Sequence, residues 1–254
     1  MPTLFIGHGS PMNAVEDNIH TRAWRQLGTS LPRPQAILAI SAHWYTNGSG
    51  VTTAAQPRTI HDFYGFPPEL FAQNYPAAGS GALARRVQEL LRPDTVVEDH
   101  EWGLDHGSWS VLTHLYPQAD VPVVQLSIDA TRAPEYHYRL GQKLAALRDD
   151  GVLILGSGGI VHNLQRMRWE AGADDYAWAV SFDQYVRSAL TRGDHQAVIE
   201  FEQIGEAAQL SVPTPEHYLP LLYVLGASSK SDEVAFPTEG IEMGSISMLS
   251  VLYS

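Results

Sequence analysis

The sequence predicts an α/β fold: one domain over residues 1–254, with a mixed, mostly parallel central sheet and helices on both faces. Continuous apolar runs without a helical period, such as Ala36–Ile40 and Val152–Leu155, are typical of strands that are covered on both faces. Between these runs lie segments with helical spacing of apolar residues, which are typical of covering helices. A chain of 254 residues is long enough for one such domain with a full core.

The N-terminal half supplies strands, a long loop and two helices. Strands are predicted at 4–6, at 36–44 between prolines and Asn47-Gly48-Ser49-Gly50, and at 51–53; helices are predicted at 13–27 and 81–91, where apolar residues recur at helical spacing. Residues 56–76 form a loop rich in proline and aromatic residues. Loops of this length are typically functional, and the alternative is that Phe63, Tyr64 and Phe66 cover an edge of the sheet.

The C-terminal half alternates strands and helices. A short helical piece at 111–116 follows a segment rich in glycine and tryptophan, and strands are predicted at 121–128, 152–155, 241–243 and 246–253. Helices are predicted at 134–147, between Pro134 and Gly151, and at 178–190 and 196–204. A last helix starts at Pro215 with Thr214 as its N-cap, and because residues 219–225 are apolar all round we expect it to be buried.

Composition excludes several classes of function. The net charge of −12, from 28 acidic and 16 basic residues, argues against nucleic acid and against anionic membranes as partners. The absence of cysteine excludes disulfides and thiolate sites, which leaves His, Asp and Glu as strong metal ligands. No apolar run is long enough to span a bilayer and no leader segment is recognisable, so we expect a soluble, cytoplasmic protein that acts on small molecules or metal ions. No pattern in the chain sets an oligomeric state.

Three histidines follow predicted strands. His8 lies between glycines after the strand 4–6, His43 ends the run that begins at Ala36, and His162 follows the glycine-rich end of the strand 152–155. Because ligands bind beyond the carboxyl ends of parallel strands, we expect these imidazoles to converge on one cleft. A single histidine in such a place is more often structural, but three with the same placement predict a metal site or an acid–base site.

The candidate ligands are His8, His43 and His217, since the first turn of the buried helix presents either Glu216 or His217 inward. His106 and His162 are the candidates for proton transfer. Asp105 precedes His106 and is interpreted as a turn cap rather than as a partner of the imidazole. Five other histidines have no flanking glycine and are expected on the surface: His20, His100, His114, His137 and His195.

Five motifs in order resemble one known family across nearly the whole chain. They are Gly7-His8-Gly9-Ser10-Pro11, Ser41-Ala42-His43-Trp44, Leu104-Asp105-His106-Gly107, Gly156-Ser157-Gly158-Gly159 with His162-Asn163, and Pro213-Thr214-Pro215-Glu216-His217-Tyr218. Together they resemble the class III extradiol ring-cleavage dioxygenases, in particular the branch similar to 4,5-DOPA dioxygenase.

The resemblance implies one divalent metal ion, Fe(II) for activity, on His8, His43 and a third ligand for which we choose His217 over Glu216. An all-histidine set also holds Zn(II) readily, so zinc is an expected occupant. The substrates would be a catechol, such as a DOPA-like diol, and O2, and the product a muconic semialdehyde. His162 would act as the base, or also as a fourth ligand, and His106 as the acid. His61 and Phe63 would contact the substrate.

Two other functions fit the same histidines. A zinc-dependent hydrolase would use them to lower the pKa of a bound water to about 7. A non-catalytic protein would only bind the metal or a small molecule. The additional pair His106 and His162 favours the oxygenase, because that reaction needs two separate proton transfers whereas a hydrolase usually needs one base.

Overall fold

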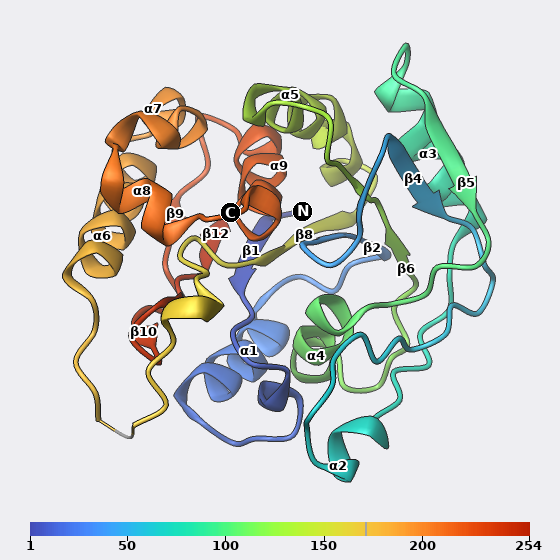
Figure 1. Cartoon of the computed structure of the whole chain (residues 1–254). Coiled ribbons are helices and arrows are strands. Elements are labelled where there is room, and N and C mark those ends of the chain that lie inside the picture. The colour runs from blue at the N-terminus through green and yellow to red at the C-terminus, as the bar shows by residue number, and fades with distance from the viewer. Residues whose placement is uncertain (171) are drawn as a thin grey trace.

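A six-stranded sheet forms the centre of the computed structural model, which describes residues 1–170 and 172–254 (Figure 1). Its strand order is β6-β2-β8-β1-β12-β9. These strands are β6 (Val123–Gln125), β2 (Ala36–Ser41), β8 (Val152–Gly158), β1 (Thr3–Gly7), β12 (Val251–Tyr253) and β9 (Val234–Ala235). The first four run parallel, while β12 is antiparallel to both β1 and β9. The predicted mixed, mostly parallel α/β sheet is therefore confirmed.

Every residue of β1, β2 and β8 is buried, because helices cover both faces of the sheet. Alternate side chains of β2 separate into two cores: Leu38 packs with one set of helices and Ile37 with the other. The first set is α3 (Gly81–Leu91), α5 (Pro134–Leu144) and α9 (Leu219–Ala227); the second is α1 (Ile19–Ser30) and α4 (His106–Leu115). Figure 1 shows α5 and α9 above the sheet and α1 and α4 below it. This two-sided cover explains the apolar runs without alternation.

The buried helix α9 lies directly against α5 and β8. A β-carbon at Gly141 of α5 would lie 2.3 Å from the Tyr223 carbonyl oxygen, and one at Gly226 of α9 would lie 2.1 Å from the Tyr138 carbonyl oxygen. The two helices can approach this closely only because both contact positions lack a side chain. All residues of α9 are buried, as its uniformly apolar sequence predicts.

The prediction of one continuous helix that starts at Pro215 is wrong. Pro215–His217 forms a separate 3-10 turn, η5, and α9 begins at Leu219. The Thr214 side chain makes no capping hydrogen bond to the backbone. Pro220 explains the break, because proline has no N–H to donate to the carbonyl of residue 216. The turn that bears His217 is therefore a separate element from the helix that follows.

Other predicted segments also divide or change their bounds. Residues 121–128 give β6 and then β7 (Ile128–Asp129), which pairs with β3 (Tyr45–Thr46). Residues 246–253 give β11 (Ile246–Ser247), which pairs with β10 (Ile241–Glu242), and then β12. Residues 13–27 begin with the 3-10 turn η1 (Pro11–Ala14), and α1 starts only at Ile19 after Asn18, whose side chain accepts hydrogen bonds from the first turn.

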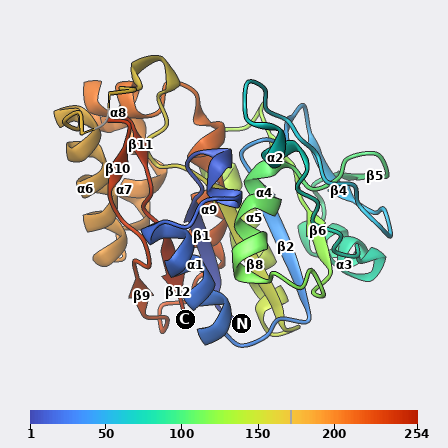
Figure 2. The same cartoon turned by 90° about the horizontal axis from the view of Figure 1, so that it is seen from below.

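The remaining elements flank this core, and Figure 2 shows them from below. A small sheet pairs β4 (Ser49–Thr52) with β5 (Val96–Asp99), and the long loop contains the short helix α2 (Pro68–Phe71). The other helical elements are η2 (Ala145–Arg148), η3 (Leu164–Arg166), α6 (Ala177–Thr191), α7 (His195–Ile199), η4 (Phe201–Ile204) and α8 (Glu206–Ser211). The predicted helix 196–204 is thus two short pieces. Among the described residues, none of the helices is long and apolar enough to cross a membrane.

The helix α4 begins earlier than the expected 111–116. It starts at His106, and Asp105 is its N-cap, with Asp105 Oδ1 accepting a hydrogen bond from the Ser108 N–H at 3.1 Å. This confirms the interpretation of Asp105 as a cap. The earlier start matters for function because it places the His106 side chain on the first turn of a helix packed against the sheet.

Candidate metal centre

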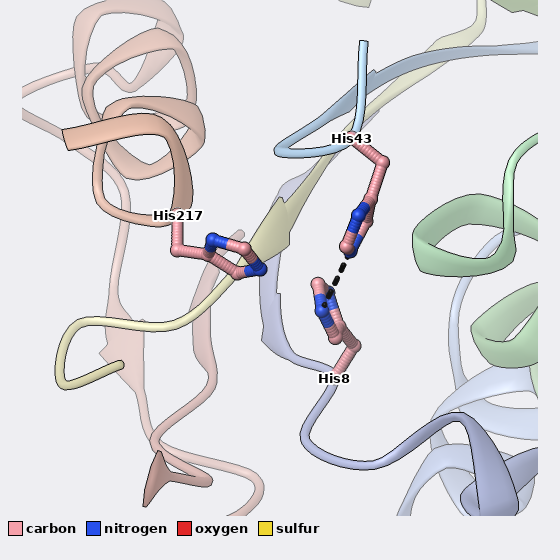
Figure 3. Close-up of side chains that lie close together, drawn as sticks. All are labelled: His8, His43 and His217. Atoms are coloured by element: carbon pink, nitrogen blue, oxygen red, sulfur yellow. Dashed lines mark hydrogen bonds between the residues drawn. The ribbon is translucent and has the colours of Figure 1, made fainter. Parts of the chain in front are cut away.

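Three histidines meet beyond the carboxyl ends of the parallel strands (Figure 3). His8 directly follows β1, His43 follows β2, and His217 ends η5. One ring nitrogen from each lies within 4.8 Å of those of the other two, and the Nε2 atoms of His8 and His43 are 3.3 Å apart. His8 and His217 are buried and His43 is half-buried. The convergence expected of the strand ends therefore includes His8 and His43, and His217 joins them from a turn.

The glycine run at the end of β8 allows the His217 turn to approach the sheet. A β-carbon at Gly158 would lie 2.1 Å from the His217 carbonyl oxygen, and the Gly159 N–H donates a hydrogen bond of 2.8 Å to the same oxygen. Gly158 also contacts the other segment, since its carbonyl oxygen accepts a hydrogen bond of 3.0 Å from the His8 N–H, and Gly9, next to His8, has a φ of +60°. Glycine at these positions thus sets the backbone that carries two of the three imidazoles.

Burial keeps all three imidazoles neutral at neutral pH. Burial lowers the pKa of His8, His43 and His217 well below the usual 6.5, and repulsion from the neighbouring histidines lowers these pKa values further. For His43, the Asp62 carboxylate opposes part of this decrease. A neutral imidazole has a lone pair for a metal ion, so the cluster is ready to bind one without first losing protons.

Each of the three rings directs its Nδ1 atom to an oxygen outside the cluster. His8 Nδ1 is 2.9 Å from Ser157 Oγ and His43 Nδ1 is 3.5 Å from Asp62 Oδ2. His217 Nδ1 donates to Glu216 Oε1 at 3.1 Å, and its buried Nε2 has no hydrogen-bond partner among the described residues. Glu216 therefore lies on the outer side of His217. The group formed with His8 and His43 contains the histidine, not the glutamate.

His162 and His106 flank the three. The His162 ring lies parallel to that of His217, with centroids 3.4 Å apart and planes 8° apart. Burial and then repulsion from His106 lower the His162 pKa to about 4. The His106 ring centroid is 3.9 Å from that of His43. His162 forms a close group with Glu216 and His217 rather than with His8 and His43.

Asp62 is a site residue to which the sequence analysis assigned no role. Its Oδ1 accepts a hydrogen bond from the His106 backbone N–H at 2.9 Å and lies 3.0 Å from His106 Nδ1, while Oδ2 faces His43. Burial raises the Asp62 pKa, but its contacts with His106 and His43 outweigh burial and set that pKa at about 2. Asp62 lies in the long aromatic loop and gave no pattern signal, because its partners His43 and His106 are 19 and 44 residues away.

Of the two loop residues predicted to contact substrate, Phe63 lies beside His106 and His61 lies beside Phe63. The Phe63 ring meets the His106 ring edge-on at 5.6 Å between centroids, and His61 lies 5.8 Å from Phe63 and 5.6 Å from Trp109. His61 Nε2 donates to the Gln73 carbonyl oxygen at 2.9 Å. Phe63 and Phe66 are partly buried against the α1–α4 core, whereas Tyr64 is 91% exposed. The aromatic loop thus both covers the core and borders the histidine cluster.

The prediction that His20, His114 and His137 lie on the surface is wrong. His20, His114 and His137 are buried: His20 Nε2 lies 3.2 Å from Glu242, His114 Nε2 donates to the Asn13 carbonyl oxygen, and His137 Nδ1 lies 3.0 Å from the Tyr223 hydroxyl. They lie at contacts between elements, where a polar partner compensates for burial. His100 is exposed and His195 is half-buried.

Comparison with known proteins identifies the family. Residues 2–252 match the family model described as the catalytic LigB subunit of aromatic ring-opening dioxygenase. The chain is 55% identical to the 4,5-DOPA dioxygenase extradiol of Escherichia coli K12 over 99% of this chain and 94% of that protein, and 41% identical to that of Beta vulgaris over 91% and 88%.

A solved structure agrees with these relatives. The crystal structure of an uncharacterized protein from Escherichia coli K12 covers 100% of both chains with a TM-score of 0.88 and 50% sequence identity. The family acts on an aromatic substrate with O2 and uses a single metal, for which the three histidines provide a possible site. From its sequence, its fold and these relatives, the chain belongs to the LigB family of aromatic ring-opening dioxygenases and is an extradiol ring-cleavage dioxygenase.

Proposed function

We propose that residues 1–254 form a single catalytic domain that cleaves the ring of a DOPA-like catechol with O2 to give a muconic semialdehyde. The reaction would depend on one divalent metal ion held by His8, His43 and His217. The observation that carries this proposal is the meeting of three neutral imidazoles within 4.8 Å in a chain 55% identical to a 4,5-DOPA dioxygenase extradiol. The same identity argues against the hydrolase and the non-catalytic binding protein.

The residues present fit a metal ion. Two nitrogen ligands at about 2.0–2.1 Å from one tetrahedral ion lie about 3.4 Å apart, and the Nε2 atoms of His8 and His43 are separated by 3.3 Å. The third imidazole contributes a buried Nε2 without a hydrogen-bond partner among residues 1–170 and 172–254. A buried polar atom of this kind is costly unless something binds it.

The identity of the ion follows from ligand chemistry. Imidazole nitrogens suit Fe(II) as well as Zn(II), and Zn(II) binds such a set more tightly. We propose Fe(II) as the working metal and Zn(II) as an occupant that purified protein can carry. When bound, the ion would hold both catechol oxygens and transfer electron density from the ring to dioxygen.

The protein residues would position the diol and move two protons. His162 is neutral at pH 7, because burial lowers its pKa to about 4, so it can accept the proton of a catechol hydroxyl. His106 would donate a proton as the ring opens, with Asp62 holding the backbone of that residue through a 2.9 Å hydrogen bond. Phe63, at the edge of the His106 ring, and His61 behind it would contact the substrate.

The test of the function is direct. The protein is stripped of metal, reloaded anaerobically with Fe(II), and given L-DOPA or another catechol and then air. A yellow ring-opened product is expected, and it should be absent from His43→Ala. With full iron occupancy, no product from a panel of catechols would overturn the proposal, and oxygen uptake without the yellow product would indicate unspecific oxidation of the diol.

A further inference from the structure

The Ser157 hydroxyl contacts the histidine cluster but has no role in the reaction outlined above. Ser157 lies in β8, inside the glycine-rich segment Gly156-Ser157-Gly158-Gly159, and is fully buried. Its Oγ makes two contacts: with His8 Nδ1 at 2.9 Å and with the Gly107 carbonyl oxygen at 2.5 Å. The first partner belongs to the histidine cluster, and the second belongs to the first turn of α4 directly after His106.

The two contacts together fix the direction of both hydrogen bonds. A carbonyl oxygen cannot donate, so the single hydroxyl proton of Ser157 must point to Gly107. The Oγ lone pairs then remain for His8, and the 2.9 Å contact requires the proton to be on His8 Nδ1. A neutral imidazole has one N–H, and therefore His8 Nε2 must present a lone pair. That atom is the one that lies 3.3 Å from His43 Nε2.

We infer that Ser157 is the positioning residue that selects the metal-binding tautomer of His8 and couples this ligand to the helix that carries His106. This inference rests on the proposed function, since it assigns His8 as a ligand. Residues that accept the second N–H of a ligating histidine typically change metal affinity or activity about 10–100-fold when they are removed.

Close packing around Gly107 restricts movement of the hydrogen-bonded groups His8, Ser157 and the Gly107 carbonyl. A β-carbon at Gly107 would lie 2.5 Å from Ser41 Oγ and 2.8 Å from the His43 ring carbon Cδ2, so α4 starts in direct contact with a second ligand. Ser41 and Ser157 are partners across β2 and β8. A displacement of the Ser157 hydroxyl would therefore move the Gly107 carbonyl and the helix start as well as the His8 ring.

The first test uses the metal-free protein and no catalysis. In a spectrum of 15N-labelled histidines, the His8 signals should show a protonated Nδ1 and an unprotonated Nε2 at pH 8. In Ser157→Ala this preference should be lost. A His8 ring protonated on Nε2 in the unaltered protein would overturn the inference, and this measurement does not depend on whether any variant folds.

The second test measures Zn(II) binding by competition with a chromophoric chelator. Ser157→Ala should weaken binding about 10–100-fold, while Ser157→Thr, which keeps the hydroxyl, should restore most of the affinity. Ser110→Ala is the matched control, because Ser110 is a buried serine of α4 whose hydroxyl has no partner among the described residues. Equal affinity of Ser157→Ala and Ser110→Ala would overturn the inference. A failure of the dioxygenase proposal would instead appear as normal metal binding without ring cleavage.

Discussion

The imidazole of His162 lies flat against that of His217, with ring centroids 3.4 Å apart and planes inclined by 8°. His162 follows β8, whereas His217 ends η5, so 55 positions of chain separate two rings in van der Waals contact. The His162 backbone is held independently, since its N–H donates to the Ser211 carbonyl oxygen at 2.8 Å. His162 thus contacts one of the three imidazoles proposed to bind metal but does not belong to the group that His217 forms with His8 and His43.

Replacing His162 with glutamine should therefore remove proton transfer but leave the metal in place. We expect His162→Gln to bind one metal per chain while the rate of ring cleavage falls about 10²–10⁴-fold, because an amide cannot take the phenolic proton. Metal content and turnover of the Fe(II)-loaded variant check this. His100→Gln, at an exposed position, is the control. Loss of metal together with activity would show that His162 is a ligand.

The third ligand is tested by a pair of adjacent substitutions. His217→Ala should abolish stoichiometric metal binding, because it removes the buried Nε2 that has no described partner. Glu216→Gln keeps an oxygen that can accept from His217 Nδ1, so we expect it to retain one metal and to weaken binding by no more than about 10–100-fold. Isothermal titration with Zn(II) measures both. The reverse ranking would assign the metal to the glutamate.

Asp62 should affect turnover more than folding. Asp62→Asn removes the negative charge between His106 and His43 but keeps an oxygen for the His106 N–H. We expect kcat to fall about 10–100-fold, with the metal retained, because the imidazole rings lose the carboxylate that orients them. Steady-state kinetics at full Fe(II) occupancy measures this. Asp17→Asn, at an exposed ion pair, is the control, and an unchanged kcat in Asp62→Asn would contradict the assignment.

Asp183 of α6 predicts a pH dependence of stability away from the site. Burial raises the Asp183 pKa to about 6, although the Ser247 hydroxyl donates a hydrogen bond to Asp183 Oδ1. Because the folded-state pKa is above the ordinary 3.8, ionisation of this group favours unfolding. The loss of folding stability caused by this ionisation is absent below about pH 4, grows as the pH rises to 6, and is complete above about pH 7.

The corresponding variant is Asp183→Asn, which keeps an acceptor for Ser247 and cannot ionise. At pH 8 we expect its free energy of unfolding to exceed that of the unaltered protein by about 3 kcal/mol, because a pKa shift from 3.8 to about 6 costs about 1.4 kcal/mol per unit. The difference should shrink below pH 6 and vanish near pH 4. Urea denaturation of both proteins over this range measures it. A difference that does not depend on pH would show that burial does not perturb Asp183.

The strand ends were predictable from sequence because burial on both faces leaves a recognisable apolar run. The strands before His8, His43 and His162 appear as such runs, each followed by glycine or a turn. The points at which predicted segments divide were harder to predict. Pro220 separates η5 from α9, and β11 is separate from β12 because β11 pairs with β10 whereas β12 pairs with β1. Such breaks depend on contacts distant in sequence, which a local pattern does not contain.

The residues around the site divide in the same way. Histidines beside glycines were recognisable, whereas Asp62 and Ser157 act through partners 19 to 149 residues away, so no local pattern shows what their side chains contact. The buried positions of His20, His114 and His137 were missed for a related reason. Each finds one polar partner from another segment, and that partner permits burial where the surrounding sequence is polar or helical.

The central claim is that one ion bridges the ends of β1 and β2 and the η5 turn. Its most direct test is a crystal structure of metal-loaded protein with diffraction measured on both sides of the metal absorption edge. We predict one anomalous peak per chain, within bonding distance of ring nitrogens of His8, His43 and His217. A peak bound by other residues, or no peak among these three rings at full metal content, would contradict the account.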